Sequence, residues 1–319
     1  MDDTEYNSGM QVTLQENEKY RQFVSEIAQE MGVFDFKGDD IVWHYTNGAG
    51  FLGILQSASI YATQVASLND TTETKYASDI YKAAVAELIK ERDGDPEAAA
   101  FLNRVLDFVK DEPDSPTHGT SKFFVTCFSG DEDELTQWDR YSKPNGYAIG
   151  LHLRGLFREP TSQVYRVVYD PEKQMTAAKK IAAATLDLYR TGLTGERLDD
   201  PDEWGKLFFS AWDEWVYKLA PLAKDKKWRS ENEFRLVHEL KVSEFPDVRF
   251  SQKPKMLARY LPLDTPSWVK RRSKLLPIAK VWIGPGNHPA FTKISVQLLL
   301  EQMGYWNIPV EVTKCTVDW

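Results

Sequence analysis

The sequence predicts an α+β domain with a mixed, mostly antiparallel central sheet flanked by helices. Runs rich in β-branched and aromatic residues are spread over the whole chain instead of being gathered in one part of it. Segments with apolar residues at helical spacing lie between these runs. The 319 residues contain no internal repeat and no long low-complexity linker. We therefore expect one domain, residues 16–319, after a polar tail of residues 1–15.

The individual elements follow from the same patterns. Apolar residues recur at helical spacing from Tyr20 to Met31, and Gly32 then suits a helix end. The run 123–129 is apolar without alternation, which is typical of a central strand buried on both faces. Helices are expected at 16–31, 51–56, 71–110 with a break near 93–96, 173–189, 202–219 and 289–303, and strands at 41–45, 59–63, 123–129, 146–153, 164–169, 233–240, 280–283 and 310–312.

Composition and charge restrict the function classes. Apolar residues make up 42% and charged residues 27% of the chain, which is enough apolar material for an ordinary core. The formal net charge of −9 disfavours non-specific nucleic-acid binding as the main role, because an acidic surface repels polyphosphate. The segment 253–280 departs from this, with eight basic residues against one acid. We interpret it first as a solvated loop, and a local anion-binding face is the alternative.

Other features indicate a cytoplasmic protein without a membrane segment. Cys127 and Cys315 are too few for a disulfide framework and fit a reducing compartment. The N-terminus is acidic and polar, which does not fit a secretory signal. No window approaches the roughly 20 apolar residues that span a bilayer. The five histidines are scattered without metal-ligand spacing, so we expect no metal.

The first candidate site is His44-Tyr45-Thr46, at the end of an apolar strand before a Gly-containing turn. Binding groups often collect where a strand opens into a loop, although from position alone a structural histidine is the preferred interpretation of His44. Asn69 and Asp70 are interpreted first as a helix cap and second as ligand contacts.

The second candidate group follows the strand 123–129. Ser129 ends this strand, and Trp138 and Tyr141 are three residues apart, so on a helical turn they share one face. They either sandwich a planar ligand or pack against the sheet. Cys127 lies inside the apolar run, and we expect it to be buried and inert.

The third candidate pair is Glu231 and Glu233, at the mouth of a predicted strand. If the strand already holds at Glu231, the two side chains point to one face, and repulsion raises the pKa of one of them. A solvated surface explains such a pair, and so does a pocket that meets a cationic centre or a ribose hydroxyl.

Taken in order, several of these segments resemble a known family. The segments are His44-Tyr45-Thr46, Ile54-Leu55, Ile60-Tyr61-Ala62-Thr63, Leu68-Asn69-Asp70 with Glu73, Cys127-Phe128-Ser129, Trp138, Tyr141, Gly146, Trp228 with Glu231, Glu233 and Arg235, and Val281-Trp282-Ile283-Gly284. This series is similar to the bacterial family catalogued as domain of unknown function 2971, over roughly residues 40–290.

A more distant resemblance suggests a chemistry. The first half is similar to the opening of ADP-ribosyltransferase domains, and Asn232-Glu233-Phe234 resembles the Asn-Glu-aromatic step that carries their catalytic glutamate. The resemblance implies a split sheet and NAD as the substrate. Thr126 to Ser129 stands where those domains have a Ser-Thr-Ser strand.

That resemblance also implies residue roles. Glu233 would bind the ribose 2′-hydroxyl and stabilise an oxocarbenium-like centre, and Glu231 would orient the acceptor or take its proton. His44 would hold a ribose hydroxyl, while the backbone at Tyr45 would hold the nicotinamide amide. Further binding residues would be Thr46, Ser129 and Trp138, with Tyr61 or Tyr141 as the stacking aromatic.

The function predicted on this basis is an ADP-ribosyltransferase-like enzyme or an NAD glycohydrolase, which would suit phage defence or a toxin-like effector. The sequence names neither the acceptor nor the oligomeric state. The alternatives are a nucleic-acid-directed enzyme or binder that uses the segment 253–280, and a non-catalytic interaction protein.

Overall fold

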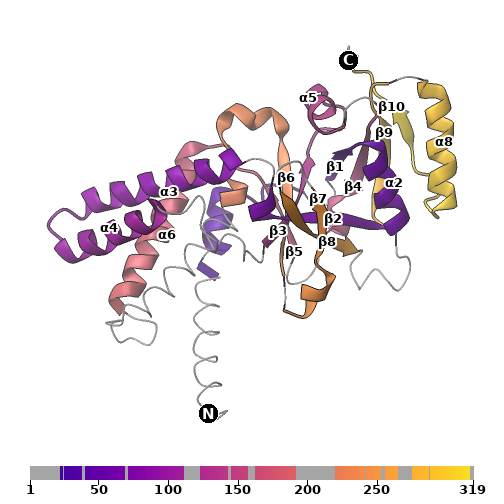
Figure 1. Cartoon of the computed structure of the whole chain (residues 1–319). Helices are drawn as coiled ribbons and strands as arrows, with labels where there is room; N and C mark the ends of the chain where they lie inside the picture. Colours follow the sequence, from indigo (N-terminus) through magenta and orange to yellow (C-terminus); the bar gives the residue numbers. More distant parts are fainter. Residues whose placement is uncertain are drawn as a thin grey trace, which may run out of the picture. The chain divides into compact units, whose positions relative to one another are not determined.

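The structure is a computed structural model of the chain (Figure 1), and it describes residues 22–23, 25–37, 40–68, 71–110, 123–142, 145–156, 162–191, 220–240, 242–252, 256–264, 275–286 and 288–316. These residues form two compact units, and each unit is assembled from segments that are far apart in the sequence. Unit 1 comprises Met1–Phe34, Asp70–Thr120 and Val168–Lys226, and unit 2 comprises Asp35–Asn69, Ser121–Val167 and Lys227–Trp319. The expected tail at residues 1–15 lies outside the described residues.

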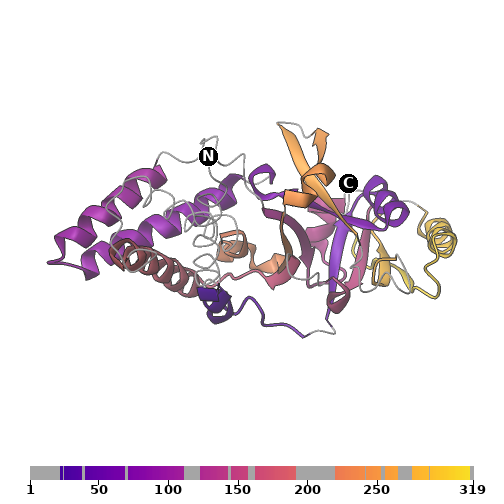
Figure 2. The same cartoon turned by 90° about the horizontal axis from the view of Figure 1, so that it is seen from below.

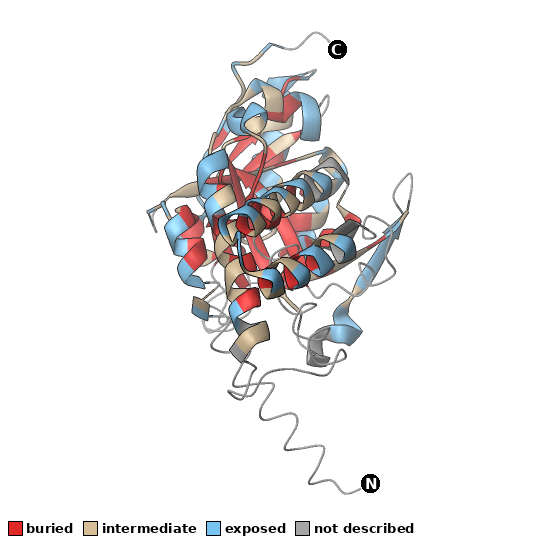
Figure 3. Cartoon of the chain, turned by 90° about the vertical axis from the view of Figure 1, so that its left-hand side faces the viewer, coloured by how far each residue is buried: buried red, intermediate tan, exposed pale blue. Residues whose placement is uncertain are grey.

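Unit 1 is built around three long helices, α3 (Thr71–Glu91), α4 (Pro96–Lys110) and α6 (Pro171–Thr191), with α3 packed against the other two (Figures 1 and 2). Each helix is buried along one side and exposed along the other, as Figure 3 shows. The break between α3 and α4 lies where the sequence predicts it. Gly94 has a φ of 91°, and Asp95 accepts a hydrogen bond from the backbone N–H of Ala98, which caps α4.

Unit 2 holds the sheet, whose described strands number ten. The strands are β1 (Ile41–Thr46), β2 (Ser59–Gln64), β3 (Phe123–Ser129), β4 (Tyr147–His152), β5 (Ser162–Arg166), β6 (Glu233–Glu239), β7 (Arg249–Gln252), β8 (Leu257–Asp264), β9 (Ile278–Ile283) and β10 (Val310–Val312). Their order is β10-β9-β4-β1-β3-β2-β8-β7, with β6 also beside β3 and β5 beside β6. Among these strands β10 and β9 pair in parallel and the other pairs are antiparallel, so the predicted α+β class with a mixed, mostly antiparallel sheet is confirmed.

The strand β3 divides the sheet, because two strands share one of its edges. β6 pairs with β3 along its whole length, from Phe123 to Ser129. On the opposite edge, β1 pairs at Ser129 and β2 pairs at Phe124 and Val125. Since β1 and β2 meet β3 at different ends, the sheet splits between them.

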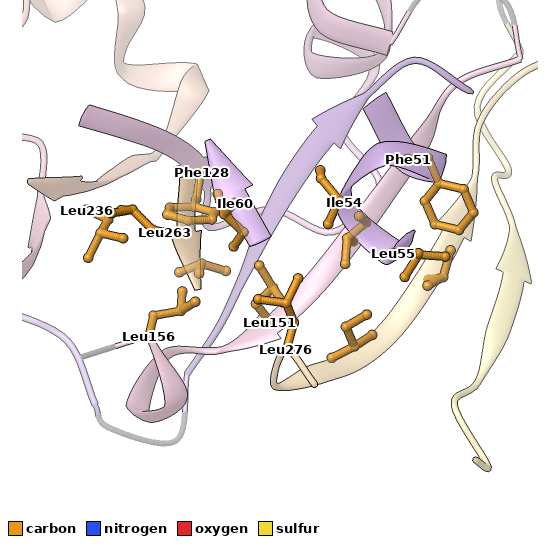
Figure 4. Packing of buried hydrophobic residues seen from close by; sticks show 14 of the residues in the cluster. Phe51, Ile54, Leu55, Ile60, Phe128, Leu151, Leu156, Leu236, Leu263 and Leu276 are labelled. Carbon is orange, nitrogen blue, oxygen red and sulfur yellow. The ribbon is translucent and has the colours of Figure 1, made fainter. Parts of the chain in front are cut away.

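One face of the sheet packs onto the main hydrophobic cluster, seen from close by in Figure 4. Helix α2 (Gly48–Ser57) contributes Phe51, Ile54 and Leu55 to this cluster, and α8 (Pro289–Gln302) contributes Val296 and Leu300. Burying a side chain of this size stabilises the fold by roughly 1.5–3 kcal/mol relative to leaving it exposed. Helix α2 therefore packs against this face of the sheet through these three side chains.

The predicted strands agree with the described ones to within three residues at each end, but a hairpin and the short helical segments at 135–142 and 226–231 were not predicted. The described residues of 16–31 are helical up to Met31, and Gly32 follows with a φ of 81°, as expected. The hairpin of β7 and β8, which extends the sheet from β2, was missed. All four residues of β7 are exposed and show no alternation, and Pro262, a residue that disfavours strands, lies within β8. The predicted helix 202–219 lies outside the described residues.

Candidate functional site at the split in the sheet

His44 lies where β1 separates from β3. The register that pairs Trp43 with Ser129 would place Tyr45 opposite Cys127 if the two strands continued together. Instead, the Nδ1–H of His44 donates a hydrogen bond of 3.1 Å to the carbonyl oxygen of Cys127. The half-buried imidazole thus satisfies a β3 carbonyl that the backbone of β1 no longer reaches.

This hydrogen bond fixes the chemistry of the ring. Because the Cys127 carbonyl can only accept, Nδ1 carries the proton and Nε2 is the acceptor nitrogen. Burial lowers the pKa of His44 below its usual 6.5, and the bond to Cys127 offsets part of that effect. His44 is therefore a neutral imidazole at pH 7, able to accept a hydrogen bond from a hydroxyl group.

The other side of the split is held in the same way. The hydroxyl of Thr126 donates a hydrogen bond of 3.1 Å to the carbonyl oxygen of Tyr61 on β2. The Tyr61 ring is 42% exposed and lies against Tyr260, with ring centroids 4.9 Å apart at 38°. Tyr61 therefore offers an aromatic surface beside the split.

Glu233 begins β6, directly across from the end of β3. Trp43, Ser129 and Glu233 lie side by side on three neighbouring strands. The Glu233 side chain is buried, and Arg235 holds both of its oxygens, with Nε–Oε1 at 2.8 Å and Nη2–Oε2 at 3.0 Å. Two residues apart on one strand, the pair shares a face, so alternation along β6 is the signal that could have found Arg235.

The side chains of His44 and Glu233 lie on opposite faces of the sheet. Alternation along β1 puts His44 on the opposite face from Trp43, and its ring meets Phe128 edge to face at 5.9 Å. Glu233 is on the same face as Trp43, because both residues lie directly opposite Ser129. The His44 ring nevertheless borders the opening, because the carbonyl it binds lies at the edge of β3 in the plane of the sheet.

The two glutamates do not share a strand as expected. Glu231 ends a 3₁₀ segment, η7 (Lys226–Glu231), and Asn232 has a left-handed φ of 42° before β6 begins. Asparagine tolerates this conformation better than most residues. Each carboxylate faces its own guanidinium, Glu231 that of Arg140 and Glu233 that of Arg235. The expected repulsion between two neighbouring carboxylates is therefore replaced by two ion pairs.

Three predicted binding residues support the site instead of facing its opening. The hydroxyl of Tyr45 donates to the carbonyl of Asp131 and accepts from the backbone N–H of Glu134, and burial raises its pKa well above the usual 10.0. Ser129 is buried; its hydroxyl donates to the Glu231 carbonyl at 3.0 Å and accepts from the Asp131 N–H at 3.1 Å.

Thr46 is the third of these residues. It packs against the first turn of α2, where a Cβ on Gly50 would lie 2.1 Å from the Thr46 hydroxyl oxygen. A glycine at position 50 therefore permits this close approach of α2 to the end of β1.

The expectation that Trp138 and Tyr141 share one face is wrong. Trp138 is fully buried, packs edge to face against Tyr45 at 4.8 Å and donates its indole N–H to Asp133, whereas Tyr141 is 51% exposed. Both lie in a π-helical segment, η3 (Trp138–Ser142), whose wider turn breaks the three-residue spacing. Trp138 is thus a core residue, and its ring is not accessible to a ligand.

Cys127 also differs from its expected state. Its side chain is exposed, in a strand whose other residues are buried. Because β1 and β2 separate on either side of this position, neither strand covers the thiol. Alternation and apolar context could not reveal a local opening of this kind.

Several sequence predictions lie outside the described residues. These are Asn69, Asp70 and six of the eight basic residues in 253–280. Of the remaining two, Arg259 lies on β8, and Lys280 on β9 pairs with Glu132 and Glu311. The anion-binding interpretation of this segment stays a prediction.

The described residues include neither a metal-binding cluster nor a helix that could span a membrane. None of their His, Cys, Asp and Glu side chains gather in groups of three or more that could hold a metal ion. Across the same residues, no helix is both long and apolar enough to cross a membrane.

Comparison with known proteins adds a family resemblance. Residues 137–236 match the family model described as protein of unknown function (DUF2971). The matched stretch begins just before Trp138 and ends within β6, so it includes the turn that carries Glu231 and Glu233. It supports the resemblance to this family drawn from the short motifs. No curated protein and no solved structure matches the chain.

Proposed function

We propose that the protein cleaves the nicotinamide–ribose bond of NAD and transfers the ADP-ribose to an acceptor or to water. The proposal rests mainly on one observation. The split between β1 and β2 is bordered by the neutral His44 imidazole, with an acceptor nitrogen, and by the exposed Tyr61 side chain, and the Glu233 carboxylate lies across β3 from the split, on the opposite face of the sheet from His44.

Each group has a role that its chemistry supports. When the C–N bond breaks, the electron pair leaves with nicotinamide, and positive charge develops on the ribose. Glu233 accepts a hydrogen bond from the ribose 2′-hydroxyl, and its negative charge stabilises the cationic centre. Nε2 of His44 accepts a hydrogen bond from a hydroxyl on its own face of the sheet, opposite to Glu233, and Tyr61 stacks on a ring of the substrate. The acceptor then forms a bond to the ribose carbon that nicotinamide has left, and its proton passes to water.

The decisive experiment compares free nicotinamide released from NAD by the wild type and by Glu233→Gln. Losing one such electrostatic group lowers the rate about 100- to 1,000-fold. Glu239→Gln is the matched control, since it makes the same change at the other end of β6 and should keep the wild-type rate. Circular dichroism of both variants establishes that they are folded.

A second variant covers the risk that Glu233→Gln is unstable, because it leaves Arg235 buried without its charge partner. Tyr61→Leu changes a side chain that is 42% exposed, so it should preserve the fold and weaken NAD turnover. A folded Glu233→Gln protein with full activity, or a wild type that releases no nicotinamide, would count against the proposed function.

A further inference from the structure

Arg140 and Glu231 form an ion pair at the end of η7, immediately before the turn that leads to Glu233. Nη1 of Arg140 is 2.6 Å from Oε1 of Glu231. The Glu231 side chain is 3% exposed and that of Arg140 is 36% exposed. The carboxylate of Glu231 is therefore covered by protein, not presented to an arriving acceptor.

Arg140 contacts η7 at two places on the same side. Its guanidinium carbon lies 4.2 Å from the centroid of the Trp228 ring, in cation–π contact. A 3₁₀ helix has three residues per turn, so Trp228 and Glu231 lie one above the other. One guanidinium can thus stack on the ring and bind the carboxylate, which holds the last turn of η7 in place.

The backbone of the turn is fixed from the neighbouring strands. The Glu231 carbonyl accepts from the Ser129 hydroxyl, and the Asn232 carbonyl accepts from the Gly130 N–H at 2.7 Å. The Glu233 carbonyl accepts from the Val167 N–H at 2.9 Å. The Arg140–Glu231 pair adds a side-chain anchor immediately before the left-handed residue that directs Glu233 into β6.

We propose that Arg140 is a positioning residue that acts through Glu231 to hold the Glu233 carboxylate in place for the reaction. The inference rests on the proposed function and changes one expected role: Glu231 anchors the turn and does not handle the acceptor. Without Arg140, the buried Glu231 carboxylate would lose the guanidinium that faces it and move towards water. The turn would shift with it, and a displacement of about 1 Å at a reacting group can cost about 100-fold in rate.

The test measures kcat and KM for nicotinamide release in four variants: Arg140→Met, Arg140→Lys, Glu231→Gln and the double variant Arg140→Met/Glu231→Gln. Arg140→Met should lower kcat about 10- to 100-fold and change the KM for NAD by less than about twofold. Arg140→Lys, which keeps the charge, should restore most of the rate. The double variant should be no slower than the worse single variant, since the two residues act as one unit.

Arg190→Met is the matched control. Arg190 pairs with Asp95 in unit 1 and has a side chain that is 28% exposed, so the variant removes a comparable ion pair. It should keep the wild-type kcat. Thermal unfolding of every variant separates loss of folded protein from loss of rate.

The possible outcomes decide between the roles. An active wild type with unchanged kcat in Arg140→Met would overturn the inference and leave the proposed function standing, even if thermal stability fell. A second result would also overturn the inference: Glu231→Gln impairs transfer to an acceptor but not hydrolysis, and Arg140→Met stays fully active. That result would assign Glu231 to handling the acceptor. A wild type without nicotinamide release rejects the proposed function itself, and the positioning role with it. If Arg140→Met does not fold, Glu231→Gln, which removes the same ion pair, decides instead: an unchanged kcat for nicotinamide release in this variant overturns the inference.

Discussion

Replacing Gly150 by alanine should destabilise unit 2 by about 1–3 kcal/mol, the usual cost of overpacking a core. Gly150 lies on β4 opposite Trp43, and a Cβ at this position would meet Cζ3 of the indole at 2.7 Å and Cη2 at 2.8 Å. The Trp43 ring is buried in a cluster with Tyr45, Trp138 and Trp282. It cannot move aside without disturbing that cluster, so the added methyl group must displace the strands.

Two further variants sharpen this prediction. Gly53→Ala makes the same chemical change on α2, where no atom lies within 4 Å of the new Cβ, and it should stabilise the helix by up to about 1 kcal/mol. Trp43→Phe removes the outer ring atoms that the new methyl group meets. In that background the added cost of Gly150→Ala should shrink.

Urea unfolding followed by circular dichroism measures these differences. A Gly150→Ala variant as stable as the wild type would refute the pairing of β1 with β4 described above. A slip of one residue would place Ile149 or Leu151 opposite Trp43 and turn His44 to the other face of the sheet. The prediction therefore tests the register that positions the candidate site.

Two other predictions concern the supports of the site. Burial lowers the pKa of His44 in the folded protein below 6.5. As the pH falls below that value, the unfolded chain therefore binds a proton more readily than the folded protein does. The stability of the fold should be full above pH 6.5 and decline below it. The unfolding free energy of wild type relative to His44→Asn should show this decline, by at most about 1.4 kcal/mol per pH unit, and a constant difference would contradict it. Tyr45→Phe leaves the Asp131 carbonyl and the Glu134 N–H without their partner and should cost about 1–3 kcal/mol in urea unfolding; unchanged stability would show that the hydroxyl does not hold this loop.

Local patterns were sufficient for most of the elements. The break before Pro96, the helix end at Gly32 and the burial of β3 follow from backbone preferences and from the apolar run, which act within a few residues. The hairpin of β7 and β8 does not follow from such patterns. Its place beside β2 depends on pairing across about 200 residues, and its exposed outer strand lacks the alternation that marks a half-buried strand.

The candidate site was only partly predictable for the same reason. The position of His44 at a strand end and the Glu-Asn-Glu step both drew attention to residues at the split. The roles of Trp138 and Ser129 depend on a π-helical segment and on a turn fixed by distant strands, and neither has a local signature in the sequence. Arg140 was missed because its partner lies 91 residues further along the chain.

The position of β3 has a consequence for how the opening can move. Its amide protons are shielded by β6 along one edge and, except at the split around Cys127, by the ends of β1 and β2 along the other. Deuterium can replace such protons only when flanking strands detach, so exchange in β3 should be among the slowest in the sheet. Motions that widen the split must then come from β1 and β2, while β3 stays rigid.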